Sequence, residues 1–525
     1  MAGESFAEFD GCMDEVVVSV GPVSFAELVA VTRYGAPVRL SAESRSAITT
    51  ARSYVEELAA APTPAYGIST GFGALANRHI PVEMRAQLQK SLVRSHAAGS
   101  GPEVEREVVR GLMLLRLSTL ATGRTGVRLE TAELMAGLLS HGITPVVREY
   151  GSLGCSGDLA PLAHCALALM GEGEVRDASG ALLPAAEALA AVGLVPVEFE
   201  AKEGLALING TDGMLGMLVL AISDLDLLLK TADISAAMSV EGLLGTDRVF
   251  APELQAIRPH PGQQASAANL ARILADSGVV ASHRGPDCNR VQDAYSLRCS
   301  PQVHGAARDT MAHCAQVAER ELASAVDNPV VLADGRVESN GNFHGAPVAY
   351  VLDFAAIIAA DVASISERRT DRFLDKSRNQ GLPPFLADDP GVDSGHMIAQ
   401  YTQAAIVSEL KRLANPASVD SIPSSAMQED HVSMGWSAAR KLRKSIDGLT
   451  RVIAIEVLTA ARGLDLRAPL VPSPATAAVV ALLRSSGIQG PGPDRYLSPE
   501  IEAAVELVRS GAVLTAVEDA IGELA

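Results

Sequence analysis

The residues with the most unusual chemistry lie in the segment Gly-Ser-Leu-Gly-Cys-Ser-Gly-Asp-Leu-Ala-Pro-Leu-Ala-His, which runs from Gly151 to His164. At its centre, Cys155, Ser156 and Gly157 follow one another. The amide nitrogen of Gly157 can attack the carbonyl carbon of Cys155, because glycine has no side chain to block the approach and tolerates a strained backbone. The new five-membered ring then loses one water, and Ser156 loses its hydroxyl as a second. The product is a 4-methylidene-imidazol-5-one, an electrophile made from the backbone.

A simpler interpretation of the same segment is a glycine-rich turn with Asp158 capping the helix that follows. The two interpretations differ in what they require elsewhere. A turn needs no further residues, whereas an electrophile needs groups that bind a substrate and move a proton.

The whole segment closely resembles the signature of the histidine and aromatic amino-acid ammonia-lyases, in which Ala or Cys precedes Ser-Gly-Asp-Leu-Ala-Pro-Leu. The resemblance continues in the family's order from about Tyr66 to Arg467. It implies that the chain makes its own ring from Cys155, Ser156 and Gly157, without a metal. The Cys155 side chain departs from the commoner Ala, but the atoms that cyclise belong to the backbone.

A loop is expected at Tyr-Gly-Ile-Ser-Thr-Gly-Phe-Gly, residues 66–73, because its glycines forbid a regular helix. Taken alone, it is a flexible surface loop. The family resemblance implies instead that this loop covers the active site and that Tyr66 is the catalytic tyrosine.

Three polar residues, Gln292, Tyr295 and Arg298, are spaced three apart and would share one face of a helical turn. The fork of an arginine matches both oxygens of a carboxylate, although a salt-bridged surface turn explains the same spacing. The resemblance implies that Arg298 binds the substrate carboxylate, that Gln292 assists, and that Tyr295 stands beside the electrophile as a catalytic residue.

Asn209 and Phe343 are further candidate binding residues by the same resemblance. Asn209 matches an asparagine that contacts the ring and the substrate, and Phe343 matches an aromatic residue next to the electrophile. Their simpler interpretations are a helix N-cap for Asn209 and an ordinary core residue for Phe343.

His96 and Glu429 bear on the choice of substrate. As simple features, His96 is a cation near a helix C-terminus and Glu429 an acid in a first helical turn. By resemblance, family members that act on phenylalanine usually carry Leu at the first position and often an amide at the second. An imidazole has two nitrogens for these polar partners, whereas a phenyl ring leaves each partner unpaired at a cost of roughly 1–3 kcal/mol.

These residues together predict the deamination of L-histidine to trans-urocanate and ammonia. Tyr66 is the expected base, and Glu429 is either an imidazole partner or the proton acceptor. A tyrosine or phenylalanine ammonia-lyase or aminomutase is the alternative, and a catalytically silent homotetramer is another. His396, which stands where a Phe is frequent in the family, bears on the shape of the pocket. A metal-dependent hydrolase is disfavoured, because no clustered His, Asp and Glu ligands occur.

The elements that must hold these residues are mainly α-helical. Long segments such as 214–229, 350–362 and 442–453 are apolar at helical spacing, which predicts a central helical bundle. Long apolar helical patterns begin near residue 200. They divide the chain into a mixed N-terminal part, 1–200, with the ring-forming and lid loops, and a helical body, 201–525. The resemblance implies a homotetramer, and helices apolar on several faces agree with that.

The composition excludes other classes of partner. The chain has 525 residues and a formal net charge of -19, which argues against nucleic acids and anionic membranes. Its six cysteines form no Cys-x-x-Cys pair and read as reduced thiols. The acidic N-terminus shows no signal peptide, so a cytoplasmic protein is expected.

Overall fold

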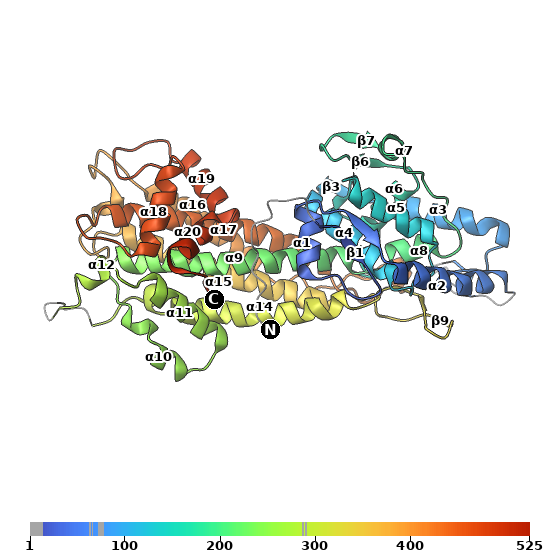
Figure 1. Cartoon of the computed structure of the whole chain (residues 1–525), viewed down its shortest axis with the longest axis horizontal. Helices are drawn as coiled ribbons and strands as arrows, with labels where there is room; N and C mark the ends of the chain where they lie inside the picture. Colours follow the sequence, from blue (N-terminus) through green and yellow to red (C-terminus); the bar gives the residue numbers. More distant parts are fainter. Residues whose placement is uncertain (1–13, 62–64, 66, 72–77, 286–287, 289–290) are drawn as a thin grey trace. The chain divides into compact units, whose positions relative to one another are not determined.

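The computed structural model of the chain describes residues 14–61, 65, 67–71, 78–285, 288 and 291–525 (Figure 1). Helices α1–α20 and only short strands make up its regular elements, which confirms the predicted mainly α class. The chain divides into two compact units. Unit 1 comprises 1–220, 316–352 and 417–440, and unit 2 comprises 221–315, 353–416 and 441–525. The boundary near residue 200 stays a prediction.

Unit 1 begins with elements whose ends carry the expected caps. Ser24 and Glu27 form a reciprocal capping box at the start of the first helix, and Ser41 accepts the Ser44 amide at the start of the second. The helices of unit 1 that lie wholly inside it are α1 (Phe25–Arg33), α2 (Ala42–Ala60), α3 (Arg85–His96), α4 (Arg106–Ala121), α5 (Leu129–Ser140), α6 (Leu159–Leu169), α7 (Ala185–Ala191) and α8 (Glu203–Ile208), with 3-10 turns at Val82–Met84 and Ser425–Met427.

The strands of unit 1 form four small sheets. β1 (Val16–Val18) pairs in parallel with β2 (Val38–Leu40), and β8 (Val330–Val331) pairs antiparallel with β9 (Val337–Glu338). A three-stranded sheet has the order β4 (Thr144–Pro145), β6 (Glu174–Arg176), β7 (Leu182–Pro184).

The remaining sheet positions the site. β3 (Ser100–Glu103) pairs antiparallel with β5 (Arg148–Tyr150), and Ser100 stands opposite Tyr150. β3 follows α3 closely, and β5 immediately precedes the segment that begins at Gly151. This short pairing therefore brings the C-terminal end of α3 next to the start of the ring-forming segment.

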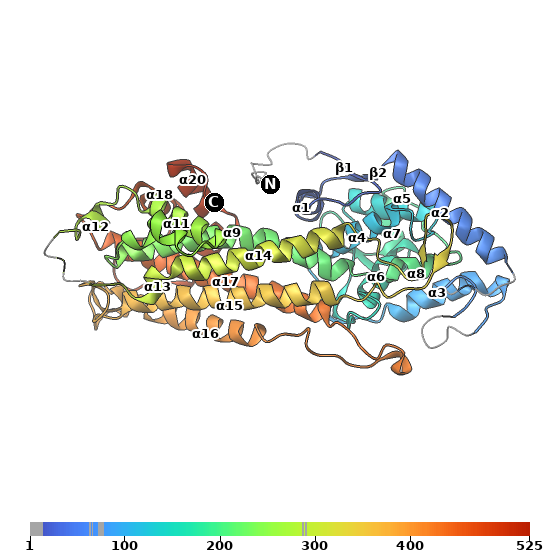
Figure 2. The same cartoon turned by 90° about the horizontal axis from the view of Figure 1, so that it is seen from below.

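Unit 2 contains the rest of the helices, and four long ones cross the division between the units: α9 (Asp212–Gly242), α14 (Ser300–Leu322), α15 (Ala346–Leu374) and α17 (Gly435–Asp465). These long helices confirm the expected bundle, and Figure 2 shows them from a second side. Wholly inside unit 2 are α10 (Pro252–Ala256), α11 (Pro261–Ile273), α12 (Gly278–Ala281), α13 (Tyr295–Arg298), α16 (Met397–Leu413), α18 (Pro474–Ser485), α19 (Ser498–Arg509) and α20 (Ala512–Ile521), with 3-10 turns at Arg248–Phe250 and Pro384–Leu386.

A buried ion pair ties the long helices of unit 2 together. Glu456 of α17 pairs with Arg369 of α15, and both side chains are fully buried. The carboxylate also accepts the hydroxyls of Ser235 and Ser239 on α9 and of Ser366 on α15. One acid thus links three helices, and its hydrogen bonds offset the cost of burying it.

α15 is less buried than its sequence predicts. Apolar residues on several sides suggested burial all round, but Phe354 and Ile357 are 42% and 44% exposed. By length and composition α15 is the one helix among the described residues that could cross a membrane, yet 67% of that apolar window is buried inside the structure. Burial of that extent is typical of a core helix with one apolar face left open.

Candidate active site

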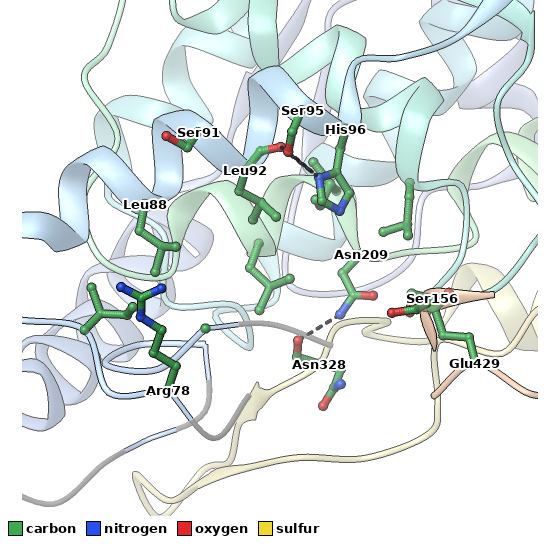
Figure 3. Close-up of a pocket in the computed structure, with 16 residues that line it drawn as sticks. Arg78, Leu88, Ser91, Leu92, Ser95, His96, Ser156, Asn209, Asn328 and Glu429 are labelled. Atoms are coloured by element: carbon green, nitrogen blue, oxygen red, sulfur yellow. Dashed lines mark hydrogen bonds between the residues drawn. The ribbon is translucent and has the colours of Figure 1, made fainter. Parts of the chain in front are cut away.

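A cavity of about 620 Å³ in unit 1 gathers several of the candidate residues (Figure 3). Its wall includes Ser156 from the ring-forming segment, His96 at the end of α3, Asn209 after α8, and Glu429. α3, α6 and α8 pack against one another beside it, so side chains far apart in the sequence face one space. The cavity belongs entirely to unit 1.

The backbone around Ser156 is held in a tight, left-handed turn. The φ angles of Ser156 and Gly157 are 50° and 79°, a region that costs any residue except glycine energy. Gly154 bridges to Gly157, and Gly157 bridges to Gly210. A Cβ on residue 157 would stand 1.9 Å from the carbonyl oxygen of Gly210, so only glycine fits there. The backbone of this segment is thus held in a conformation that leaves no room for a side chain at residue 157.

Asp158 anchors this turn rather than capping α6. It occupies the N-cap position but makes no side-chain cap hydrogen bond. Its carboxylate instead accepts the Ser152 hydroxyl at 2.9 Å and the Met214 amide at 2.9 Å. Complete burial raises the pKa of Asp158 to about 7, against the effect of those hydrogen bonds. The simple capping interpretation of Asp158 is therefore wrong.

The Cys155 side chain is buried and points toward Glu429. Burial first, and then the Glu429 carboxylate, raise the pKa of the Cys155 thiol to about 12. The thiol therefore stays protonated and unreactive near neutral pH. Its sulfur lies 4.0 Å from the Ser424 hydroxyl, and that hydroxyl donates to Glu429 at 2.9 Å.

Glu429 is held at the end of a constrained loop. Ser424 and Glu429 bridge each other through their backbones, and between them Ser425, Ala426 and Met427 all have positive φ angles. A run of non-glycine residues in that region is costly and persists only where the surroundings enforce it. The loop thus fixes the half-buried carboxylate at the cavity wall.

His96 presents one particular nitrogen to the cavity. Its Nδ1 lies 2.9 Å from the carbonyl oxygen of Leu92, and a carbonyl only accepts, so Nδ1 carries the proton. Burial lowers the pKa of His96, outweighing the Leu92 hydrogen bond and the Glu429 charge. The neutral ring then leaves Nε2 as a hydrogen-bond acceptor.

The side-chain amide of Asn209 has one hydrogen-bonded atom and one unpaired atom. Its Nδ2 donates to the carbonyl oxygen of Asn328 at 2.8 Å, while its Oδ1 is buried and has no partner among the described residues. An unpaired buried oxygen is costly and marks a place for a donor on a ligand. The N-cap interpretation fails, since α8 ends before Asn209 and α9 begins after it.

Buried ion pairs stabilise the segment around Asn209. Arg116 pairs with Asp212 at 2.7 Å and donates to the carbonyl of Asn209 at 3.1 Å, while Lys202 pairs with Asp327 at 2.5 Å. Such pairs are strong anchors, because removing one partner leaves an uncompensated buried charge.

The other candidates lie outside this cavity. Phe343 is half-buried in a loop of unit 1 and does not line it. Gln292, Tyr295 and Arg298 belong to unit 2, where Gln292 lines a second cavity of about 340 Å³. Tyr66 lies outside the described residues.

The predicted common face of the unit 2 residues holds only in part. α13 is a single turn from Tyr295 to Arg298, so Gln292 precedes the helix. The Arg298 guanidinium lies 4.8 Å from the centre of the Tyr295 ring, a cation–π contact. The Arg298 Nε is buried and has no partner among the described residues, and Tyr295 is 72% exposed. Both side chains thus remain available to a further group.

Several wall residues escaped the sequence interpretation: Arg78, Ser91, Ser95, Asn328 and Ser425. The serines on α3 carried a detectable signal, because residues 88, 91, 92, 95 and 96 share one helical face.

Comparisons with known proteins show which family the chain belongs to. A family model described as aromatic amino acid lyase matches residues 23–485. Proteins of Streptomyces avermitilis and Streptomyces coelicolor, each named histidine ammonia-lyase, are 66% identical to this chain over 98% of it and 100% of their own length.

Among solved structures, histidine ammonia-lyase from Trypanosoma cruzi has a TM-score of 0.88 at 37% identity, covering 97% of this chain and 96% of its own. Tyrosine aminomutase from Streptomyces globisporus has a TM-score of 0.92 at 36% identity, covering 97% of this chain and 100% of its own.

Proposed function

We propose, on the premise that this chain belongs to the aromatic amino acid lyase family, that it converts L-histidine to trans-urocanate and ammonia. The observation that carries the proposal is the cavity that joins Ser156 to His96 and Glu429. These residues pair a ring-forming segment with two polar groups suited to an imidazole. Full-length identity of 66% to proteins named histidine ammonia-lyase supports the same substrate.

The prosthetic ring in this proposal is a 4-methylidene-imidazol-5-one made from Cys155, Ser156 and Gly157. The left-handed turn at Ser156 and the lack of space for a side chain at residue 157 fit such a cyclisation. When formed, the ring supplies an electrophile that turns the substrate amine into a leaving group. The neutral Cys155 thiol takes no part in forming it.

His96 and Glu429 recognise the substrate side chain. The Nε2 of His96 accepts an N–H of the imidazole, because its Nδ1 proton is committed to Leu92. Glu429 is fixed by Ser424 on the same cavity wall and is the second partner. The open Oδ1 of Asn209 accepts from the substrate amine.

The remaining roles follow the family. Arg298 holds the substrate carboxylate with its fork, Gln292 assists, and Tyr295 and Phe343 stand beside the electrophile. Tyr66 or Glu429 takes the β-proton, and positioned proton transfer of this kind contributes ~10²–10⁴-fold to the rate.

The active form in this proposal is a homotetramer in which other subunits supply the unit 2 residues to each cavity. Two observations support it: the described residues that line the cavity all belong to unit 1, and Tyr295 is 72% exposed while the buried Nε of Arg298 has no hydrogen-bond partner among the described residues. The tetramer is expected to be cytoplasmic.

Incubation of the purified protein with L-histidine, L-tyrosine and L-phenylalanine tests the proposal. A conjugated imidazole acrylate should appear in the ultraviolet with L-histidine, and the other two should give far less product. Formation of a β-amino acid from L-tyrosine would instead favour the aminomutase alternative. The Streptomyces globisporus enzyme, a tyrosine aminomutase, has a similar fold.

A further inference from the structure

His164 lies on α6, the helix that begins directly after the ring-forming turn, and its role is not explained by the proposed function. It is half-buried, and its Nε2 accepts the backbone amide of Gly99 at 3.1 Å. The hydrogen bond joins residues 65 positions apart. It therefore ties α6 to the chain that leaves α3, the helix that ends at His96.

A side chain at residue 99 would crowd this contact. Gly99 does not cap α3, because the helix ends at His96 with Ala97 as its C-cap, and Gly99 is not among the residues with positive φ. The residue at position 99 is limited instead by the space around it. A Cβ on residue 99 would stand 3.0 Å from the Nε2 of His164 and 3.2 Å from the carbonyl oxygen of Tyr150.

The turn between His96 and Gly99 has little other support. The Ala97 amide donates to the carbonyl of Val93 at 2.9 Å, and the Ala98 amide donates to that of His96 at 2.8 Å. Both bonds are local, so they shape the turn without attaching it to the rest of unit 1. The His164 bond, together with the pairing of Ser100 with Tyr150, supplies that attachment.

The charge state of His164 agrees with this contact. Burial, and then the nearby Arg148 guanidinium, lower the pKa of His164, so the ring is neutral near pH 7. Since the Gly99 amide donates to Nε2, the ring proton sits on Nδ1.

We propose that His164 is a positioning residue for imidazole recognition: by accepting the Gly99 amide, it fixes the turn that ends α3 and thereby holds His96 at the cavity wall. The proposal rests on the proposed function, because it assigns His96 to the substrate imidazole. His164 does not touch the substrate. It acts through His96, so its loss weakens binding more than chemistry.

Four variants of the purified full-length protein separate positioning from general stability. His164→Leu removes the acceptor at similar size. His164→Gln keeps an acceptor at nearly the reach of Nε2. Gly99→Ala pushes the amide away from the intact histidine. His141→Leu replaces an exposed histidine at the end of α5 and is the matched control.

Steady-state kinetics on L-histidine are the first measurement. His164→Leu should raise KM about tenfold, as expected for one lost hydrogen bond, with kcat within about threefold of wild type. His164→Gln should recover most of the loss, and His141→Leu should behave as wild type. The effects of Gly99→Ala and His164→Leu should not add in full in the double variant, because both changes break the same hydrogen bond.

Two further measurements do not depend on turnover. Intact mass should show the loss of two waters in every variant, and hydrogen exchange of the peptide containing Gly99 should be faster in His164→Leu than in wild type or His164→Gln. If wild type does not convert L-histidine, the proposed function fails, while the exchange result still decides whether the attachment exists. If the hydrogen exchange of the Gly99 peptide is unchanged in His164→Leu, His164 does not attach the turn to α6. A fall in kcat at constant KM, or no rescue by Gln, overturns the positioning role.

Discussion

Three acceptors at the cavity wall form a pattern at the scale of single residues. The Nε2 of His96, the Oδ1 of Asn209 and the carboxylate oxygens of Glu429 are hydrogen-bond acceptors at this wall. An amino acid with an amine and an imidazole brings N–H donors to such a wall, whereas a phenyl ring brings none. Because each unmet buried polar group costs roughly 1–3 kcal/mol, the wall favours L-histidine over L-phenylalanine.

The first prediction replaces both imidazole partners. The double variant His96→Leu, Glu429→Gln should lose about 10²-fold or more in kcat/KM for L-histidine, since hydrogen bonds to charged or buried groups contribute about 1.5–3 kcal/mol each. Any remaining activity should shift toward L-phenylalanine or L-tyrosine. The measurement is kcat/KM for the three amino acids.

The single variants serve as the controls for that experiment. Their effects should not add, because both side chains contact one ring. An unchanged preference for L-histidine in the double variant would contradict the assignment of His96 and Glu429.

A second prediction concerns the ring itself. Ser156→Ala should not show the loss of two waters and should nearly lose turnover, because it has no hydroxyl to eliminate. Cys155→Ala should still lose two waters, since only backbone atoms of residue 155 cyclise and burial keeps the thiol neutral. Intact-mass spectrometry reads both variants. An active wild-type enzyme of full unmodified mass would show that no such ring exists.

At the scale of elements, the buried acid of unit 2 supports the turn that carries Tyr295 and Arg298. Besides its pair with Glu456, Arg369 donates to the carbonyl of Ser296 at 3.4 Å and to the Ser300 hydroxyl at 3.3 Å. These bonds are long, but they join Arg369 to a residue of α13 and to the first residue of α14. We therefore expect both the stability of the bundle and the placement of the turn with Arg298 to depend on the Arg369 guanidinium.

The third prediction tests that dependence. Arg369→Met should destabilise the protein by about 3–5 kcal/mol, because Glu456 is left buried without its partner. The double change Arg369→Met, Glu456→Met should regain much of that loss, since a buried pair replaced by apolar residues is often neutral. Denaturant unfolding of the two variants measures both values.

The pH dependence of the stability tests the same ion pair. Burial opposes ionisation of Glu456, yet Arg369 and the serine hydroxyls hold its pKa below the ordinary value of 4.5. A lowered carboxyl pKa contributes stability above about pH 4.5 and loses it as the pH falls through the folded value. The double variant should therefore lack that part of the acid sensitivity. Equal acid sensitivity in wild type and the double variant would contradict this account.

At the scale of the whole molecule, the sequence predicts helices and motifs better than contacts. The mainly α class, the long helices of the bundle and the helix that ends at His96 follow from local sequence patterns. The reason for Gly99 could not be predicted, because the side chain that crowds it stands on α6, 65 residues away. Gln292 lay outside the expected helical face, since spacing alone does not fix where α13 begins.

The open apolar surface of unit 2 leads to the last prediction. Phe354 and Ile357 on α15, and Ile398 and Tyr401 on α16, are 42–59% exposed at i, i+3 spacing. Monomers rarely expose apolar patches beyond a few hundred Å², so we expect these faces to be covered in a homotetramer. Light scattering on active enzyme should give four times the 54.6 kDa chain mass.

Variants can link that assembly to catalysis. Phe354→Asp with Tyr401→Asp should yield smaller species with little turnover, because under the proposed assembly each cavity would then lack the Arg298 of another subunit. Their mass should still show the loss of two waters, since the ring-forming turn lies wholly in unit 1. Val195→Asp, at a residue of unit 1 that is 75% exposed, is the control and should remain tetrameric and active. A monomer that retains full activity would contradict both the assembly and the shared site.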